Sequence, residues 1–409
     1  MTTERNMTRY SWSLVAMLWV VACLNYFDRI VLTSMRDPIV AEFHMNDAQF
    51  GLLTSVFLWS YAILSPFGGF FADKYSRKGV IVLSVAIWSA VTLWTGYVKS
   101  YNELLLTRFL MGVSEACYLP AALALITDHH RDRTRSLATG LHMSGLYAGL
   151  ALGGLGGYIT ESWGWRSAFL VFGIFGIVYA SFLFFSLKER KGHVSQAEPT
   201  ETKRDEMSIV RSVGALFKER SFNILLFYFT VLGTANWLIY GWLPTFLKDQ
   251  FNLRLGEAGI SATGYIQIGS LLGVVVGGMV ADRWARRNPK GRIHVIILGF
   301  TVGAPFLFLM STTSVFTVAI FAMFVFGLAR GFNDANLMPI LRQVADERYI
   351  ATGYGFLNLF SSVVGGLMVY VGGALKDADL RLSVIYQSAA VLMLVATWSL
   401  FLIRSVKKN

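Results

Sequence analysis

Apolar segments of about 20 residues recur along the whole chain, separated by shorter polar segments. A helix of that length crosses the hydrocarbon core of a bilayer. Twelve segments qualify, at residues 11–32, 49–71, 80–98, 103–127, 137–160, 167–187, 221–247, 259–281, 293–312, 316–341, 352–374 and 383–403. The pattern predicts an all-α integral membrane protein with twelve transmembrane helices.

The chain contains two copies of one long unit. Residues 68–78 and 277–287 share the motif Gly-Gly-x-x-Ala-Asp-x-x-x-Arg-Lys/Arg, and residues 112–120 and 331–339 share glycine, an acid, alanine and proline in the same frame. Repeats in the same order in both halves indicate internal duplication. We therefore expect two pseudo-symmetric six-helix bundles, at 1–190 and 221–409. The polar stretch at 191–220 is the expected cytoplasmic linker, with a short amphipathic helix over 207–217 as one interpretation and a plain solvated linker as the other.

The formal charge of +11 reflects membrane topology. With the N-terminus placed in the cytoplasm, most Lys and Arg residues fall in cytoplasmic segments, as the positive-inside rule requires. We expect a multi-pass protein of the inner (plasma) membrane with both termini cytoplasmic. Its surroundings are then the lipid bilayer, and the basic balance does not indicate nucleic acid.

The sequence offers no constellation for catalysis. Cys23 and Cys117, the two cysteines, both fall within predicted spans, so no disulfide framework is implied. No phosphate-binding glycine loop, metal-ligand spacing or nucleophile–base pairing occurs in the sequence. We expect a protein that is not an enzyme, with no metal and no cofactor, driven by an ion gradient.

Four ionisable residues interrupt the spans of the first half. Such groups cost about 2.5–3.5 kcal/mol each on insertion scales and are functional candidates. A guanidinium binds carboxylates bidentately and keeps its charge, so Arg29 is the expected site for an anionic substrate. Asp28 and Glu115 are the expected proton carriers, and Arg108, two turns before Glu115, is its expected partner or a gate. The alternative is that all four form structural ion pairs.

Asp334 occupies the repeat position of Glu115, and Arg330 precedes it by one helical turn. The two side chains are spaced to pair along one helix. We expect Asp334 to be a second titrating site or a substrate contact. A helix-internal ion pair is an equal alternative.

The doubled glycine–aspartate motif predicts a conformational latch. Small residues allow helices to approach closely in lipid, and an acid near a helix end can bind basic residues or a neighbouring helix N-terminus. We expect Asp73 and Asp282 just beyond their helix ends. The alternative is that these basic loops only anchor topology. The latch candidates are Gly69, Asp73, Arg77, Gly278, Asp282 and Arg286.

The doubled motif, the central linker and the six-plus-six plan resemble the major facilitator superfamily over essentially the whole chain. Residues 25–29, 108–116 and 242–247 resemble the anion:cation symporter group, which includes hexuronate and galactonate permeases and sialin. Spinster-type lysolipid transporters also carry Asp-Arg in span 1 and Glu in span 4. The resemblance implies alternating access, import and a monomer, and it supports Arg29 as the substrate arginine with titrating acids beside it.

Further polar residues complete the expected cavity. Tyr61 and Asn358 match substrate-site positions of the family, whereas Leu146 lies where the galactonate-type pattern has glutamine. His142 is available on the fifth span as a polar group or proton relay. Helix–helix hydrogen bonding is the alternative for each residue. The expected substrate-binding residues are Arg29, Tyr26, Tyr61, Ser144, Asn236 and Asn358.

Together these features predict a secondary active transporter that moves a small, sugar-acid-like organic anion together with protons. One alternative is a spinster-like carrier of lysolipid or another amphipath. A more distant alternative is a solute sensor that signals through the linker.

Overall fold

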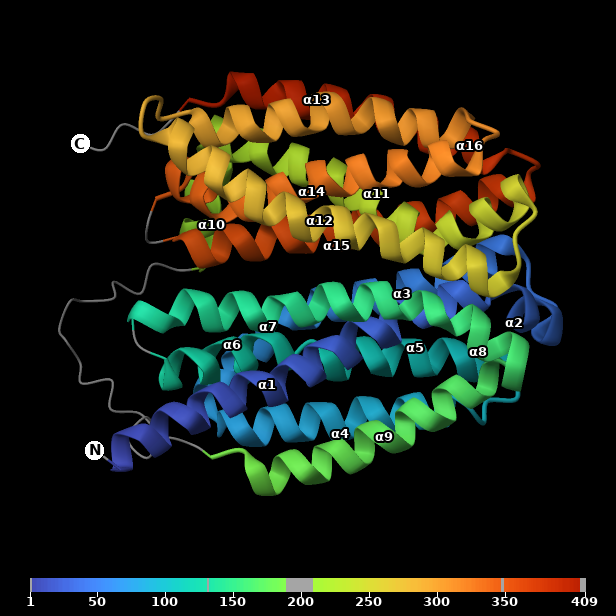
Figure 1. Cartoon of the computed structure of the whole chain (residues 1–409), viewed down its shortest axis with the longest axis horizontal. Coiled ribbons are helices and arrows are strands. Elements are labelled where there is room, and N and C mark those ends of the chain that lie inside the picture. The colour runs from blue at the N-terminus through green and yellow to red at the C-terminus, as the bar shows by residue number, and fades with distance from the viewer. Residues whose placement is uncertain (1, 131, 189–208, 347–348, 405–409) are drawn as a thin grey trace. The chain divides into compact units, whose positions relative to one another are not determined.

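The computed structural model describes residues 2–130, 132–188, 209–346 and 349–404, and every regular element in these ranges is a helix (Figure 1). The first half comprises α1 (Thr2–Val31), η1 (Leu32–Met35), α2 (Arg36–Phe43), α3 (Asp47–Lys74), α4 (Arg77–Thr95), α5 (Tyr101–Glu115), α6 (Tyr118–His129), α7 (Asp132–Leu152), η2 (Gly153–Leu155), α8 (Gly156–Trp163) and α9 (Trp165–Ser186). The second half comprises α10 (Ile209–Lys218), α11 (Arg220–Phe251), α12 (Leu255–Ala285), α13 (Gly291–Thr312), α14 (Phe316–Val344), α15 (Ile350–Asp377), α16 (Leu382–Ser399) and η4 (Leu400–Leu402).

Eleven of the described helices are long and apolar enough to cross a membrane, against twelve expected spans. The remaining expected span, 137–160, is present as α7 and α8, but a turn of 3₁₀ helix at Gly153–Leu155 divides it. The first membrane-capable helix is also longer than expected, because η1 and α2 extend it to Phe43. The all-α membrane architecture is confirmed.

Local sequence signals set the starts of three helices in the first half. Asn46 accepts a hydrogen bond from the Gln49 backbone N–H at 2.8 Å, and the Gln49 side chain accepts one from the Asn46 N–H, forming a capping box at α3. Ser76 caps α4 and Ser100 caps α5 in the same way, through side-chain oxygens that accept backbone N–H groups.

The duplication extends to a helix end that the motifs do not cover. His44 ends α2 and Asn252 ends α11, each in the left-handed conformation with φ of 50° and 51°. The next long helix starts three residues later in both halves, at Asp47 and Leu255. A left-handed residue terminates a helix by redirecting the chain, so both copies turn by the same local geometry.

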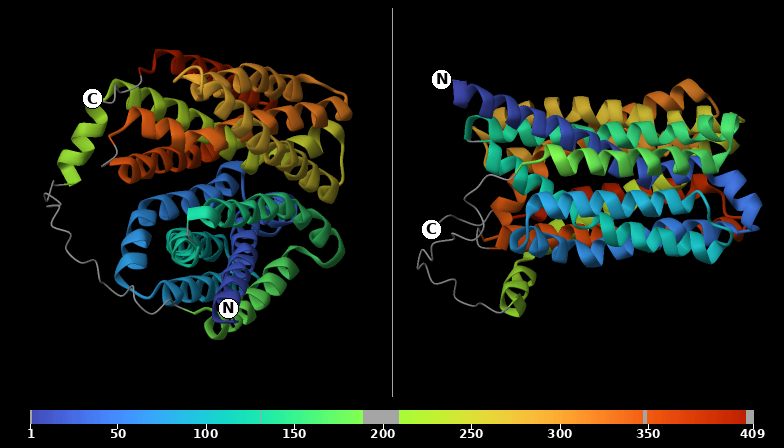
Figure 2. Two further views of the ribbon diagram at one scale, coloured as in Figure 1. Left: turned by 60° about the vertical axis from the view of Figure 1, so that its left-hand side comes forward. Right: turned by 90° about the horizontal axis from the view of Figure 1, so that it is seen from below.

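The chain divides into two compact units. The first contains Met1–Pro199 with Arg254–Ile260, and the second contains Thr200–Leu253 with Ser261–Asn409. In the first unit α1 packs along α7 and α4 along α9, side by side in Figures 1 and 2. In the second unit α11 packs along α15 and α13 along α16. The first and fifth long helices of the repeated unit therefore pack together in both copies, and so do the third and sixth.

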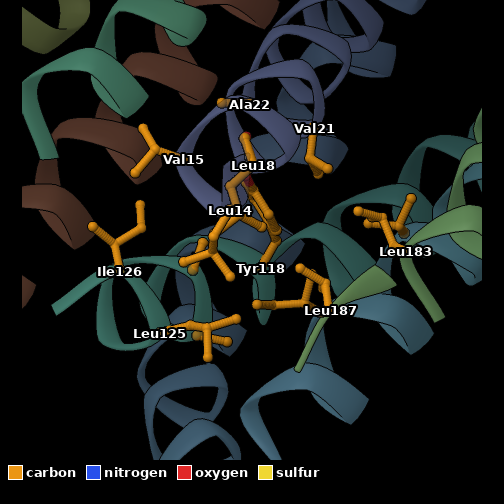
Figure 3. Packing of buried hydrophobic residues seen from close by; sticks show 14 of the residues in the cluster. Leu14, Val15, Leu18, Val21, Ala22, Tyr118, Leu125, Ile126, Leu183 and Leu187 are labelled. Atoms are coloured by element: carbon orange, nitrogen blue, oxygen red, sulfur yellow. Dashed lines mark hydrogen bonds between the residues drawn. The ribbon is translucent and has the colours of Figure 1, made fainter. Parts of the chain in front are cut away.

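Apolar side chains of α1, α4, α6, α7 and α9 form a core at one end of the first unit (Figure 3). Leu18, Tyr118 and Leu187 are at most 1% exposed there, and the Tyr118 hydroxyl donates to the Leu18 carbonyl at 2.8 Å. Leu146 belongs to this core. This packing holds α1 against α6, the continuation of the helix that carries Glu115.

Most of the expected linker lies outside the described residues, at 189–208. Its C-terminal part forms α10, close to the amphipathic helix predicted at 207–217. The Phe217 ring packs edge-on against Phe222 and Phe356 at centroid distances of 5.9 and 5.5 Å. The end of α10 at Phe217 thus packs against α11 and α15 of the second unit.

Candidate functional site

A buried ion pair joins α1 to α5 in the first unit. The Arg29 Nε lies 2.8 Å from the Glu115 Oε2, and the side chains are 4% and 0% exposed. A charge-assisted bond of this length is among the strongest polar contacts in a protein interior. Arg108 was expected as the partner of Glu115 or as a gate. Arg29, from another helix, forms the close ion pair with Glu115 instead, and a gating role of Arg108 remains a prediction.

Three aromatic rings surround the Arg29 guanidinium. Its central carbon lies 4.5 Å from the Tyr26 ring centroid, 4.3 Å from that of Tyr61 and 5.2 Å from that of Phe57. Aromatic faces attract cations, more strongly where water is excluded. Tyr26 and Tyr61, predicted as substrate residues, thus contact the predicted substrate arginine, and Phe57 is an addition that the sequence analysis missed.

Asp28 and Arg108 lie beside this pair and are 4% and 0% exposed. The Asp28 Oδ2 accepts a hydrogen bond from the Thr92 hydroxyl at 3.3 Å. The Arg108 Nη1 donates to the Asp28 main-chain oxygen at 3.4 Å, and its guanidinium lies 5.1 Å from the Phe57 ring. Among the described residues, Asp28 Oδ1, Glu115 Oε1, and Arg108 Nε and Nη2 have no hydrogen-bond partner. Buried polar atoms without partners are rare in native proteins and often mark functional sites.

A glycine sets the distance between the helices that carry these groups. A Cβ on Gly112 of α5 would lie 2.0 Å from the Ser60 Oγ and 2.6 Å from the Phe57 carbonyl oxygen of α3. Only a residue without a side chain permits this approach. The contact brings Arg108 and Glu115 on α5 next to Phe57 and Tyr61 on α3.

The other predicted substrate residues have individual surroundings. Ser144 is half-buried, donates to the Leu141 carbonyl at 2.7 Å and accepts from the Trp19 indole at 3.0 Å. Asn236 on α11 and Asn358 on α15 are also half-buried, and the Asn358 amide donates to the Tyr354 carbonyl at 3.1 Å. The binding roles of all three remain predictions.

His142 lies in the packed core of the first unit. It is 0% exposed, and its ring centroid is 6.0 Å from that of Tyr118. Neighbouring Leu146 is buried in the same core at 7% exposure. The structure thus places His142 in the interior beside Tyr118, and its role as a polar group or proton relay remains a prediction.

The second unit contains a cluster around Arg330. Its Nε lies 3.8 Å from the Asp334 Oδ2, as the one-turn spacing predicted, and its Nη1 donates to the Tyr240 hydroxyl. The Gln267 Nε2 donates to the same hydroxyl at 3.2 Å. Tyr240 and Gln267 were not expected, although a buried amide within the apolar span of α12 is a signal that sequence analysis can detect.

Both copies of the glycine–aspartate motif lie at close contacts between helices, one copy in each unit. A Cβ on Gly68 would lie 2.4 Å from the Ala116 carbonyl oxygen, and one on Gly277 would lie 2.7 Å from the Phe332 Cα. Gly278 is less constrained, with the nearest such contact at 3.8 Å. The close contacts that the structure describes are therefore those of Gly68 and Gly277, the first glycine of each copy.

Among the charged latch candidates, Asp282 binds a basic residue at the start of a neighbouring helix, as expected. Asp282 lies in the last turn of α12 and binds Arg292 at the start of α13, while Arg286 is exposed. Arg77, the first residue of α4, binds Asp128 near the end of α6. Asp73 likewise falls within α3, so neither aspartate lies beyond its helix end as predicted. The side-chain surroundings of Gly69 and Asp73 lie outside the described residues.

Comparisons with known proteins give the family. The Major Facilitator Superfamily model matches residues 18–369. Protein spinster of Drosophila melanogaster is 29% identical over 91% of this chain, which spans 63% of the fly protein's length. The probable galactarate/D-glucarate transporter GarP of Escherichia coli (strain K12) is 23% identical, with 98% of this chain and 96% of that protein covered.

A solved structure has the same fold. The bacterial homologue of the human lysosomal transporter spinster, in an inward-facing and unoccupied conformation, superimposes with a TM-score of 0.78 at 21% identity. The superposition covers 98% of this chain and 99% of that one. From the family match over most of its length, the chain belongs to the major facilitator superfamily of membrane transporters.

Proposed function

We propose that this transporter moves a small, sugar-acid-like organic anion together with protons. The observation that carries the proposal is the buried Arg29–Glu115 ion pair, with Arg29 held among three aromatic rings. Arg29 is suited to bind a substrate carboxylate. In the absence of substrate, the Glu115 carboxylate binds the Arg29 guanidinium. Substrate and Glu115 thus compete for one guanidinium.

The competition provides a coupling mechanism. A protonated Glu115 no longer neutralises Arg29, so protonation makes the guanidinium available to an external anion. Conversely, a bound anion displaces Glu115 and favours its protonation. Proton and anion therefore bind with positive cooperativity, and such coupling is reciprocal by thermodynamic necessity.

The charge balance of the cluster supports the same scheme. Two ionised carboxyls, Asp28 and Glu115, and two guanidiniums, Arg29 and Arg108, sum to zero charge. Each proton taken up adds one positive charge, and unpaired charge inside a membrane is costly. An anion that enters with the protons restores neutrality, which favours symport over uncoupled anion movement.

The remaining features of the proposal follow the family pattern. Transport proceeds by alternating access, with residues 1–190 moving against residues 221–409, in an inner (plasma) membrane with both termini cytoplasmic. The proton gradient drives import, and the working form is a monomer without a cofactor. Asp334 serves as a further coupling residue.

A second candidate function is transport of a lysolipid or another amphipath. A half-open apolar cavity of about 400 Å³ lies at the surface of the second unit between α11, α15 and α16. Thr230, Thr234 and Ser388 supply hydroxyls, and the other lining residues are apolar. Such a cavity is suited to an alkyl chain, and a relative named spinster is among the matches.

Uptake into proteoliposomes tests the proposal. Glucarate, gluconate and a lysophospholipid are offered with and without an inward proton gradient, to wild-type protein, Arg29→Ala and the matched exposed-arginine control Arg381→Ala. We expect proton-stimulated uptake of a sugar acid that Arg29→Ala abolishes and the control preserves. Uptake of the lysophospholipid and of neither sugar acid would support the second candidate function instead. Acid uptake that Arg29→Ala leaves intact would refute the role of this arginine.

A further inference from the structure

The second unit has its own buried cation, which the proposed coupling scheme does not use. Arg330 is 9% exposed as a residue and lies against the Tyr240 ring, 5.3 Å from its centroid. Its acid partner Asp334 is farther away than Glu115 is from Arg29, at 3.8 Å instead of 2.8 Å. The Asp334 side chain is also 30% exposed, whereas that of Glu115 is 0% exposed. The Asp334 Oδ1 also accepts a hydrogen bond from the Asn333 Nδ2 at 3.2 Å. A partly exposed carboxylate at this longer distance from its arginine is easier to displace than a short, dry ion pair.

Hydrogen-bond counting at Tyr240 identifies a donor beside Arg330. A phenol has two acceptor positions and one donor. The Tyr240 oxygen accepts from Arg330 and from the Gln267 Nε2, so its own proton points away from both. The Gln267 Oε1 is buried and has no partner among the described residues. If the Gln267 side-chain amide is flipped by 180°, its oxygen accepts a hydrogen bond from the Tyr240 hydroxyl, and the amide N–H groups are then the donors available to a ligand. In both orientations a donor remains for a ligand.

We propose that Arg330, Tyr240 and Gln267 form a second anion-binding site within the second unit, with Asp334 as the internal carboxylate that an incoming anion displaces. A guanidinium next to an O–H or N–H donor is complementary to the oxygens of a carboxylate. This inference rests on the proposed function in one respect, namely that the ligand is a transported organic anion. The ligand group is either a second carboxylate of that anion or its sole carboxylate.

Helix packing alone does not account for this cluster. The Tyr228 hydroxyl already ties α11 to α14 through the Asn333 Oδ1 at 3.0 Å. Glycines bring α12 and α14 into backbone contact, since a Cβ on Gly273 would lie 2.2 Å from the Leu328 carbonyl oxygen. Both helix contacts exist without Arg330, and neither requires a buried charge, which is costly in a membrane interior.

Ligand affinity measured on purified full-length protein tests the site. Glucarate and gluconate share a six-carbon polyhydroxy chain and differ by one carboxylate. Their dissociation constants are measured by isothermal titration calorimetry. We expect Arg330→Gln to weaken binding about 10-fold or more and Tyr240→Phe, which keeps the ring, about 3-fold to 10-fold. Asp334→Asn removes the competing charge and is expected to tighten binding.

Matched controls separate this role from general damage. Lys248→Gln removes another carboxylate-paired cation of the same unit, and Tyr386→Phe removes the hydroxyl of another buried tyrosine. Both are expected to leave affinity unchanged. Gel filtration and thermal unfolding establish that each variant is folded.

The outcomes distinguish the sources of the anion. Weakening for glucarate alone assigns the site to a second carboxylate, whereas weakening for both acids assigns it to a carboxylate that they share. Unchanged affinity in folded Tyr240→Phe and Arg330→Gln overturns the site, as does an absence of saturable binding of either acid to wild-type protein. If uptake proves independent of protons while Arg330→Gln still weakens binding, the coupling scheme is lost and this site stands.

Discussion

The exchange of Glu115 for an external anion leads to a prediction for Glu115→Gln. Glutamine has the shape of glutamate and keeps an oxygen that accepts the Arg29 hydrogen bond, but it lacks the charge. Removing one partner of a buried ion pair costs about 3–5 kcal/mol. The retained hydrogen bond to a charged donor recovers about 1.5–3 kcal/mol. The net cost to the unliganded protein is therefore about 0–3.5 kcal/mol, with mid-range values giving about 2 kcal/mol.

An anion bound at Arg29 restores the missing negative charge and so recovers most of this cost. We expect Glu115→Gln to bind a transported sugar acid about 10-fold to 100-fold more tightly than wild-type protein at alkaline pH, where wild-type Glu115 is ionised. At acidic pH, where wild-type Glu115 is protonated, the two proteins are expected to converge. Isothermal titration calorimetry at several pH values measures both effects.

Glu103→Gln provides the matched control because Glu103 lies in the first turn of the same helix, α5, at the opposite end from Glu115, and accepts a hydrogen bond from the Lys99 backbone N–H. It is expected to behave as wild type at every pH. Equal affinity of wild-type and Glu115→Gln protein at alkaline pH would refute the competition. So would loss of binding in a folded Glu115→Gln protein, since that would make Glu115 a ligand contact instead of a competitor.

Two further predictions concern the surroundings of the pair. Gly112→Ala places a Cβ against the α3 backbone and is expected to destabilise the protein by about 1–3 kcal/mol, measured by thermal unfolding. The control Gly140→Ala, whose Cβ meets nothing within 4 Å, is expected to leave stability unchanged. Equal melting temperatures of the two variants would contradict this packing. Tyr61→Leu removes an aromatic face from Arg29 and is expected to weaken anion binding by about 0.5–2 kcal/mol, measured by isothermal titration calorimetry. Tyr61→Phe keeps the ring and is expected to keep most of the affinity. Identical losses in both variants would assign the effect to the hydroxyl group instead.

The architecture could be predicted from the amino-acid sequence alone, because a bilayer imposes strong one-dimensional constraints. Spans must be long and apolar, so most helices are recognisable from hydrophobic length. A charged residue within such a span is costly, and this cost alone identifies Asp28, Arg29, Arg108 and Glu115 as functional candidates. The pair of Arg330 with Asp334 is equally predictable, since both lie on one helix a single turn apart.

The contacts between groups on different helices depend on the three-dimensional packing. Arg108 and Glu115 share a face of α5, yet Glu115 pairs with Arg29, which lies 86 positions away in the chain. Helical periodicity shows which residues share a face but not which neighbouring helix that face meets. The aromatic rings around Arg29 and the position of Tyr240 beside Arg330 depend on that neighbour. His142 shows the same dependence, because only the packing places its ring on α7 beside that of Tyr118 on α6, fully buried.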